Sequence, residues 1–325
     1  MATALSALMS QPIVVLAPHP TPIDRMTRLE AALGSGCPRL FMKRDDLLSF
    51  GMGGNKVRKM QAVAAEAIAA GADTLITCGG VQSNHARVTA AAGAALGLRV
   101  ELVVNGAPQP VPTANARLDR LFGATMHYVA DRESRAPMME ELASRLRREG
   151  RRPFVVPLGA STPTGAMGFA RGVAELAADG LRPDVIVHST SSGGTQAGVI
   201  AGCALFGLRT RILGVSADES SAALGATVAN VLAGMADRLG ARPDTLGADR
   251  PVEIDDGCVG EGYGVATPAS TEALELVARR EGILLDPVYT AKAMAGVIRR
   301  IRRGEFSYDQ TVLFWHTGGQ VNNFI

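Results

Sequence analysis

The chain has 325 residues, of which 47% are hydrophobic and 20% are charged, with a formal net charge of +2. This composition is typical of a globular protein with one large domain or two smaller ones. The low net charge, without a basic cluster, argues against nucleic-acid binding, and no run of about 18 apolar residues could span a membrane.

Short β-branched runs alternate with alanine-rich helical stretches along the chain. The expected strands are 39–44, 74–77, 99–104, 124–129, 153–156, 184–188, 211–216 and 310–314. The expected helices are 56–70, 84–96, 117–122, 138–148, 165–178 and 195–205. This alternation predicts an α/β fold in which mostly parallel sheets are covered by helices on both faces.

The four cysteines, Cys37, Cys78, Cys203 and Cys258, lie far apart and match no zinc or Cys-x-x-Cys spacing. We expect each to be a small buried apolar residue, and we therefore predict no metal site. Unpaired thiols predict a cytoplasmic location, and the lack of a basic residue before Arg25 argues against a signal peptide.

A first glycine-rich segment, residues 51–59, follows an expected strand and leads into a helix. Its glycines allow another molecule to approach the backbone closely, and Asn55 is a good residue to cap the helix. Lys56 then lies in the first helical turn, where the helix dipole should lower the pKa of its amine. A neutral amine can bond to an aldehyde and later act as a base. In isolation, the same pattern is more typical of a solvated lysine.

A second segment, residues 189–198, leaves the expected strand 184–188 and becomes helical. Hydroxyl groups and free backbone N–H groups at a helix N-terminus form a cradle for an anion. The segment matches neither the Walker A nor the GxGxxG pattern, which favours a compact phosphate monoester over a nucleotide. The alternative is a polar turn between a strand and a helix.

A third segment, residues 79–87, also joins a strand to a helix. Ser83 or Asn84 is either the helix cap or a donor to a substrate carboxylate or a cofactor oxygen. His85 lies in the same turn, and we expect it to be a structural donor rather than an acid or base.

Two of the four tyrosines, Tyr263 and Tyr289, lie in turn-like contexts near the end of the chain. A phenol there can act as a general acid or base if a neighbouring cation lowers its pKa. Taken singly, each tyrosine is more often a packing residue.

Together these segments resemble the D-cysteine desulfhydrase / 1-aminocyclopropane-1-carboxylate (ACC) deaminase family of fold-type-II, tryptophan-synthase-β-like enzymes that use pyridoxal 5′-phosphate (PLP). The matching stretches occur in family order over nearly the whole chain; they are 43–46, 53–59, 80–85, 262–265, 284–290 and 316–319. The resemblance implies two open, twisted, mostly parallel sheets flanked by helices, and a homodimer. It also implies a large PLP-binding domain (1–58 and 164–325) and a small domain (59–163).

The resemblance assigns roles position by position. Lys56 would carry PLP and move the α-proton, and Asn84 would contact the ring hydroxyl oxygen. The implied catalytic residues are Lys56, Ser83, Tyr263 and Tyr289. The implied cofactor-binding residues are Lys56, Lys59, Asn84, Ser191, Ser192, Gly193, Gly194, Thr195 and Thr317, with the phosphate at Lys59 and the 191–195 loop. The implied substrate-binding residues are Ser83, Asn84, His85, Tyr263 and Tyr289.

Two threonines bear on the activity. ACC deaminases resemble this chain but carry a glutamate at the position of Thr290 and a leucine at that of Thr317. Without that glutamate the PLP ring nitrogen should be neutral, which favours α,β-elimination, with D-cysteine converted to pyruvate, sulfide and ammonia, over ring opening. The stretches 160–165 and 320–325 depart from the desulfhydrase pattern, and we expect both near the substrate pocket. ACC deamination, a cysteate or other β-substituted amino-acid lyase, an L-serine/threonine dehydratase and a non-catalytic PLP-binding protein remain alternatives.

Overall fold

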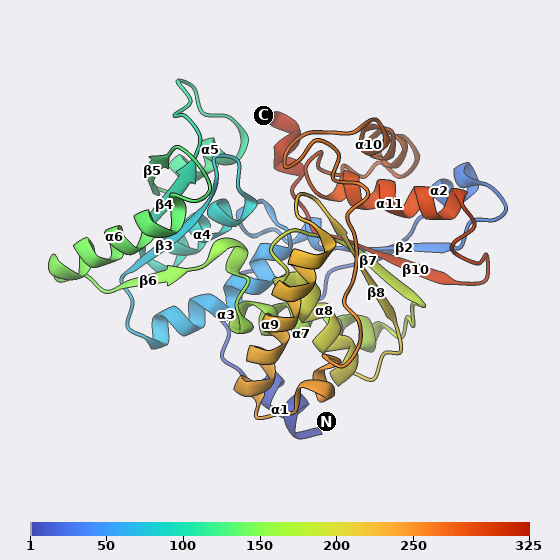
Figure 1. The fold of residues 1–325 in the computed structure, drawn as a ribbon, viewed down its shortest axis with the longest axis horizontal. Helices are drawn as coiled ribbons and strands as arrows, with labels where there is room; N and C mark the ends of the chain where they lie inside the picture. The colour runs from blue at the N-terminus through green and yellow to red at the C-terminus, as the bar shows by residue number, and fades with distance from the viewer. Residues whose placement is uncertain (1) are drawn as a thin grey trace.

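The computed structural model describes residues 2–325, and its strands form two separate sheets (Figure 1). The large sheet has the order β1-β2-β10-β7-β8-β9, and the small sheet has the order β5-β4-β3-β6. The large-sheet strands are β1 (Ile23–Arg25), β2 (Arg39–Arg44), β7 (Val185–Thr190), β8 (Arg211–Ser216), β9 (Glu253–Asp255) and β10 (Thr311–His316). The small-sheet strands are β3 (Thr74–Gly80), β4 (Arg99–Asn105), β5 (Thr125–Val129) and β6 (Pro153–Val156). Every pairing is parallel except β1 with β2, which confirms the predicted fold class.

Helices cover both faces of each sheet, as buried parallel strands require. In Figure 1, α10 and α11 lie above the large sheet, while α7 and α8 lie below it. The helices are α1 (Ala2–Ser10), α2 (Thr27–Leu33), α3 (Asn55–Ala69), α4 (Asn84–Leu96), α5 (Ala114–Leu121), α6 (Arg135–Arg148), α7 (Pro163–Asp179), α8 (Gly194–Leu205), α9 (Ser221–Leu239), α10 (Pro268–Glu281) and α11 (Thr290–Arg302). The sequence prediction did not include the helices α1, α2, α9, α10 and α11 or the strands β1 and β9. The two strands have three residues each, which is too short to show a period.

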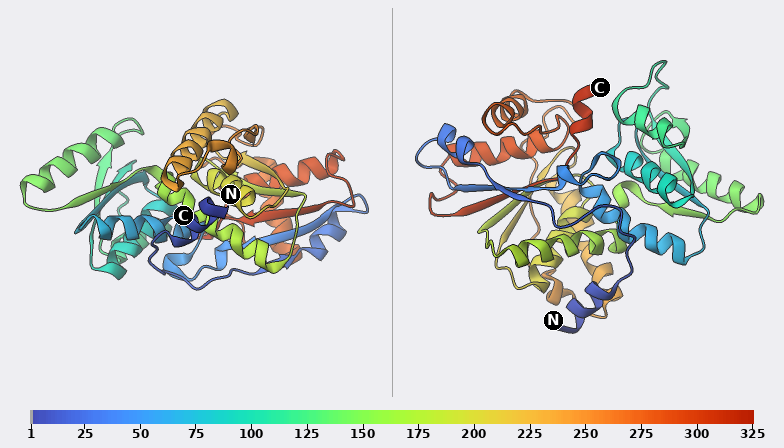
Figure 2. Two further views of the ribbon diagram at one scale, coloured as in Figure 1. Left: turned by 90° about the horizontal axis from the view of Figure 1, so that it is seen from below. Right: turned by 180° about the vertical axis from the view of Figure 1, so that it is seen from behind.

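The two sheets lie side by side rather than stacked, as the views in Figure 2 agree. Helix α3 links them, because it packs against α7 and also contributes Val57, Met60 and Val63 to the core beside the small sheet. The strands of the small sheet all lie within residues 59–163, and those of the large sheet all lie outside that range. The domain boundaries at 58/59 and 163/164 themselves stay a prediction.

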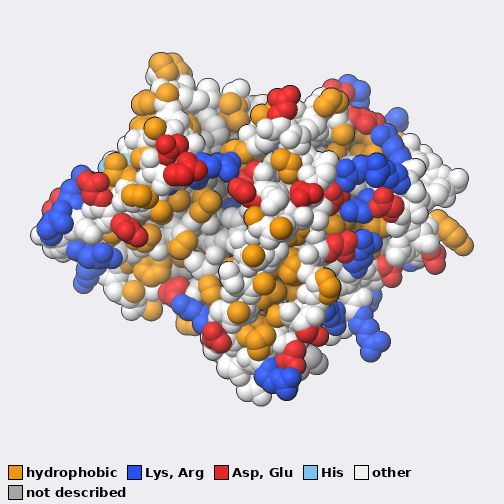
Figure 3. Space-filling model, in the orientation of Figure 1, with side chains coloured by type: hydrophobic (Ala, Val, Ile, Leu, Met, Phe, Trp, Pro, Cys, Tyr) orange, Lys and Arg blue, Asp and Glu red, His pale blue; other side chains and the backbone are white. Residues whose placement is uncertain are grey.

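The face of the molecule drawn in Figure 3 shows no patch of basic side chains that would suit a polyanion. On the side drawn in Figure 3, acidic and basic side chains are interspersed rather than gathered by sign. None of the helices within residues 2–325 is both long and apolar enough to cross a membrane.

Candidate active site

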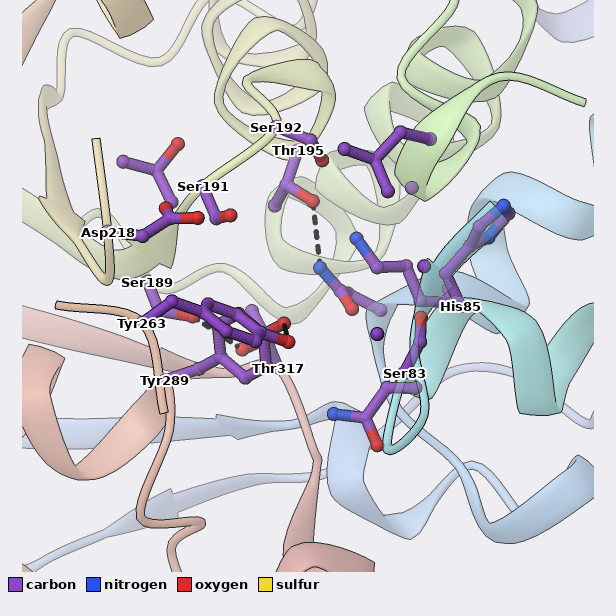
Figure 4. Close-up of a pocket in the computed structure, with 18 of the residues that line it drawn as sticks. Ser83, His85, Ser189, Ser191, Ser192, Thr195, Asp218, Tyr263, Tyr289 and Thr317 are labelled. Atoms are coloured by element: carbon purple, nitrogen blue, oxygen red, sulfur yellow. Dashed lines mark hydrogen bonds between the residues drawn. The ribbon is translucent and has the colours of Figure 1, made fainter. Parts of the chain in front are cut away.

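A pocket lies where loops from the two sheets face each other (Figure 4). It holds about 160 Å³. The predicted site residues that line it are Lys56, Ser83, Asn84, His85, Ser191, Ser192, Gly193, Thr195, Tyr263, Tyr289 and Thr317. Two predicted cofactor residues, Lys59 and Gly194, lie behind the pocket wall instead. The structure therefore brings segments from distant parts of the chain around one cavity.

Lys56 is the one lysine on the pocket wall among the four in the sequence. The Lys43 amine is buried against Glu175 at 2.7 Å. The Lys292 amine donates to the backbone carbonyls of Ala217, Val259 and Gly262, at 2.8–3.1 Å. These contacts hold the backbone next to Asp218 and Tyr263, so Lys292 supports the pocket without entering it.

Helix α3 begins one residue earlier than the capping prediction required. Gly54 is the cap residue, with φ of 98°. The position requires glycine, because a Cβ there would lie 2.9 Å from the carbonyl oxygen of Thr317. Asn55 is therefore the first helical residue, and its side-chain amide donates to the hydroxyl of Thr195 at 2.8 Å. The predicted cap was wrong, but Asn55 joins the start of α3 to the start of α8.

The Lys56 amine has an unusually low pKa. Burial lowers it from 10.5 to about 8, so burial rather than the helix dipole is the principal cause. Burial and the neighbouring Lys56 ammonium also lower the pKa of Lys59 well below its usual value. No carboxylate pairs with Lys59 within residues 2–325. A half-buried amine and a buried one, neither of them ion-paired with a carboxylate, form a site that favours an anion.

Lys59 acts on the hydroxyl-rich loop through Ser161. Its amine donates to the Ser161 hydroxyl at 3.1 Å and to the Gly159 carbonyl at 3.2 Å. The Ser161 hydroxyl in turn donates to Ser192 at 2.7 Å and accepts from the Gly194 amide at 3.2 Å. The stretch 160–165 was expected to touch the substrate pocket; it supports the anion loop from behind instead. The C-terminal residues 320–325 do not line the pocket either.

Gly159 keeps the space between the amine and this loop open. Its φ is 66°, and an added Cβ would lie 2.4 Å from the Ser192 hydroxyl and 3.3 Å from the Lys56 amine. Any larger residue at position 159 would fill the cradle between these groups.

The small-sheet wall of the pocket begins with the cap of α4. Ser83 is that cap, since its hydroxyl accepts from the Ala86 amide at 3.2 Å. Buried His85 bonds through Nε2 to the Thr77 hydroxyl at 2.8 Å, and Thr77 donates to the Val156 carbonyl. Burial and the charges of nearby lysines hold the His85 pKa well below 6.5. The ring is therefore neutral, with a structural Nε2–H bond and a free Nδ1.

The hydrogen-bond partners of Asn84 fix the orientation of its side-chain amide. Its side-chain oxygen accepts from Arg87 at 3.1 Å and from Asn115 at 3.0 Å. Asn115 also donates to Asn322, near the C-terminus, at 2.9 Å. With both oxygen positions occupied, the Asn84 amide nitrogen is the group left to serve as a donor on the pocket wall. Arg87, Asn115 and Asn322 were not anticipated from the sequence.

Tyr263 and Tyr289 share a hydrogen bond of 2.6 Å between their hydroxyl groups, and their rings meet edge to face. Burial raises the pKa of both phenols, that of Tyr289 well above 10. The condition for a phenol to act as a base, a pKa lowered by a neighbouring cation, is therefore not met. Both groups stay protonated near neutral pH, so they can donate protons but are poor bases.

Thr317 and Thr290 lie in different surroundings. The Thr317 hydroxyl lines the pocket, 3.0 Å from the Ser189 hydroxyl. The Thr290 hydroxyl points away and donates to buried Asp286 at 2.7 Å. Asp286 also accepts from the Tyr289 amide, so this carboxylate fixes the turn that carries Tyr289.

Comparison with known proteins bears directly on this geometry. The profile of the family described as "Pyridoxal-phosphate dependent enzyme" matches residues 14–318. This chain belongs to that family. Two proteins named "Putative 1-aminocyclopropane-1-carboxylate deaminase", from Pyrococcus abyssi and Pyrococcus furiosus, are each 36% identical to it, over 97% and 98% of this chain and 94% and 95% of theirs. The chain is therefore a member of the ACC deaminase / D-cysteine desulfhydrase group within the PLP family.

Solved structures with the same fold are also similar to this chain. A crystal structure titled as an ACC deaminase homologue is 34% identical, with a TM-score of 0.91 over 100% of this chain and 97% of the other. A threonine deaminase from Solanum lycopersicum is 16% identical, with a TM-score of 0.70 over 98% of this chain and 84% of the other, which shows the shared fold alone.

The pocket residues suit PLP. Lys56 supplies the amine that the aldehyde needs. The 191–193 loop, with the Lys59 amine behind it, offers hydroxyls and an amine for the phosphate. Asn84 and Thr317 offer a donor and a neutral hydroxyl for the ring oxygen and nitrogen. Within residues 2–325, no cluster of His, Cys, Asp or Glu could hold a metal ion.

The low pKa of Lys56 predicts a pH dependence for PLP uptake by the apoprotein. Only the neutral amine attacks an aldehyde, so the rate of uptake should rise with pH and level off above about 8. An ordinary lysine would continue to gain reactivity up to a pH of about 10.4. Stopped-flow measurement of the visible PLP absorption from about pH 6 to about pH 11 spans both values. A rate that still climbs at the upper end of this range would contradict the prediction.

Four charged residues on the pocket wall were missed from the sequence: Arg132, Arg135, Asp218 and Glu219. They lie in loops and at a helix start with ordinary charge patterns. Only the meeting of the loop after β5 with the loop after β8 places them together, and no local signal reports that contact.

Proposed function

We propose that the chain is a PLP-dependent lyase that eliminates the β-substituent of a small amino acid, converting D-cysteine to pyruvate, sulfide and ammonia. The observation that carries this proposal is the Lys56 amine, alone among the lysines in a pocket between a hydroxyl-rich loop and a tyrosine pair. A homodimer and a cytoplasmic location, implied by the resemblance and by the unpaired thiols, remain parts of the proposal.

Bound PLP would accept the electron pair left on Cα when the α-proton is removed. With a pKa of about 8, the Lys56 amine is neutral often enough near pH 7 to take that proton. The Ser83 turn at the start of α4 offers donors to the substrate carboxylate. Tyr289, a protonated phenol bonded to Tyr263, would donate a proton to the departing sulfur.

Thr317 favours elimination over cyclopropane opening. Its neutral hydroxyl can bond to the PLP ring nitrogen without charging it. The Thr290 hydroxyl is not free to do so, because it already donates to Asp286. A neutral ring is a weaker electron sink, which suffices for a substrate whose thiol leaves readily. ACC deamination to 2-oxobutyrate and ammonia is the second candidate, favoured by the names of the Pyrococcus relatives.

The test is a ketoacid-release screen with both enantiomers of cysteine, serine, 3-chloroalanine and cysteate, and with ACC. We expect pyruvate, with sulfide and ammonia in equal amounts, from D-cysteine. Release of 2-oxobutyrate from ACC as the fastest reaction would favour the second candidate. Bound PLP with no ketoacid from any substrate would indicate a non-catalytic protein.

The substitution Tyr289→Phe should affect kcat differently for substrates with different leaving groups. Loss of the phenol proton should lower kcat for D-cysteine by ~10²-fold or more, since general acids contribute on that scale. For 3-chloroalanine, whose chloride leaves without a proton, kcat should change several-fold at most. Steady-state pyruvate release from both substrates measures the two kcat values. The matched control is Tyr263→Phe, which removes the neighbouring phenol hydroxyl. Equal losses on the two substrates would contradict a proton-donor role.

A further inference from the structure

Arg87, in α4, is a fully buried charge that no carboxylate pairs with among residues 2–325. Burial lowers the pKa of its guanidinium from 12.5 to about 10, so it stays charged near neutral pH. The nearby acid is Asp119, whose carboxyl oxygens make no hydrogen bond within the described residues. Burial raises the pKa of Asp119 to about 8, so this group is mostly protonated near pH 7. The protein therefore leaves the charge of Arg87 largely uncompensated.

The guanidinium of Arg87 donates to three neutral oxygens. One terminal nitrogen donates to the side-chain oxygens of Asn84 at 3.1 Å and Asn115 at 3.0 Å. The other donates to the Gly53 carbonyl at 2.8 Å. Gly53 belongs to the turn that leads into Lys56, and Asn84 is the first residue of α4 on the small-sheet wall of the pocket. One buried group therefore holds the lysine turn and the Asn84 amide in a fixed relation.

The amide nitrogen of Asn84 lies on the far side of this side chain from Arg87. An added Cβ at Gly319 would lie 3.0 Å from that nitrogen, which places it against the loop that brings Thr317 to the pocket wall. Among the described residues, no acceptor takes a hydrogen bond from it. A cation bonded to an amide oxygen polarises the amide, which makes its N–H groups stronger donors. Asn84 thus offers the pocket a strengthened donor that suits an anionic oxygen.

We propose that Arg87 is a positioning residue for the cofactor. Through Asn84 its charge favours the ionised form of the PLP ring hydroxyl, and through Gly53 it holds that donor in place relative to the Lys56 turn. A lysine could not do both, because its ammonium is a single point, whereas the planar guanidinium reaches two separated oxygens at once. The inference goes beyond the proposed elimination, since it concerns how the cofactor is held for any reaction.

The test compares the binding of PLP with that of 3-deoxypyridoxal 5′-phosphate, which lacks the ring hydroxyl. In Arg87→Met, we expect the dissociation constant of PLP to rise ~10–100-fold, the scale of a hydrogen bond that involves a charge. The dissociation constant of the deoxy analogue should rise a few-fold at most, because the analogue has no oxygen for Asn84 to bind. Arg87→Lys, which keeps the charge, should recover part of the preference for PLP. Equilibrium titration of the apoproteins measures all of these constants.

The matched control is Thr89→Val, which removes another buried hydrogen-bonding group from α4. The Thr89 hydroxyl bonds within the helix, to the His85 carbonyl at 3.0 Å, and does not line the pocket. This variant should bind both ligands as the wild type does. Melting temperatures of all variants check folding.

Asn115→Asp tests the same network if Arg87→Met does not fold. It keeps the size of the side chain, gives Arg87 a carboxylate partner, and removes the N–H group that the Asn84 oxygen accepts at 3.0 Å. The charge of Arg87 is then compensated, and the Asn84 amide is free to turn its nitrogen toward the new carboxylate. We expect the preference for PLP over the deoxy analogue to fall ~10-fold or more.

Two results would overturn the proposal. If folded Arg87→Met or Asn115→Asp weakened PLP and the deoxy analogue equally, the network would support the pocket walls alone. If Arg87→Met weakened PLP as much in an Asn84→Ala background as in the wild type, Arg87 would not act through Asn84. Because the titrations measure binding rather than turnover, they decide this question whatever the ketoacid screen shows.

Discussion

Replacing Lys56 with alanine should abolish both the visible absorption of bound PLP and the release of ketoacid. Of the other three lysines, Lys43 is held by Glu175 and Lys292 by three carbonyls. The Lys59 amine neighbours that of Lys56, but it donates to Gly159 and Ser161 behind the pocket wall. None of these three lysines lines the pocket, so we expect none to replace the lost amine. We expect turnover to fall by at least ~10³-fold, because the amine is both the attachment point and the base.

The matched control is Lys292→Met, which removes a buried lysine that does not line the pocket. This variant should retain the visible PLP absorption even if its turnover falls. Thermal unfolding of both variants distinguishes loss of chemistry from loss of structure. A folded Lys56→Ala protein that still turns yellow with PLP and releases pyruvate would contradict the assignment.

Replacing Lys59 with methionine should weaken the binding of PLP but not that of pyridoxal. Lys59 reaches the loop through Ser161 and places a buried amine behind Gly194, where a bound phosphate would favour its protonated form. A buried charge contributes to the binding of a phosphate but has little to offer its neutral counterpart. We expect the dissociation constant of PLP to rise ~10–100-fold, with that of pyridoxal nearly unchanged.

Equilibrium titration of the apoprotein with both compounds measures this difference directly. The comparison controls for general damage to the pocket, which would weaken both ligands. If Lys59→Met lost affinity for both compounds equally, Lys59 would support the fold rather than bind the phosphate.

Three of the site segments that the sequence predicted share one local signature. Lys56, Ser83 and Ser191 each lie in a glycine-rich turn that follows a strand and opens a helix. In parallel sheets such turns gather at the carboxyl ends of the strands, where ligands bind. Periodicity in the flanking strands and helices was strong enough to place most of these turns within a few residues.

The rest of the site depends on contacts between distant segments. Asn115 orients Asn84 from another helix, and Ser161 supports a loop that lies 31 residues away in the chain. Arg135 resembles any arginine at the start of a surface helix until its burial and missing partner are seen. The raised tyrosine pKa values likewise follow from burial, which a turn-like sequence context does not reveal.

Reductive trapping of the cofactor tests the central claim most directly. The purified protein, loaded with PLP, is reduced with borohydride, digested and analysed by peptide mass spectrometry. The account predicts one phosphopyridoxyl group per chain, on the amine of Lys56. A label on Lys59, Lys43 or Lys292, or no label in a protein that has bound PLP, would contradict it.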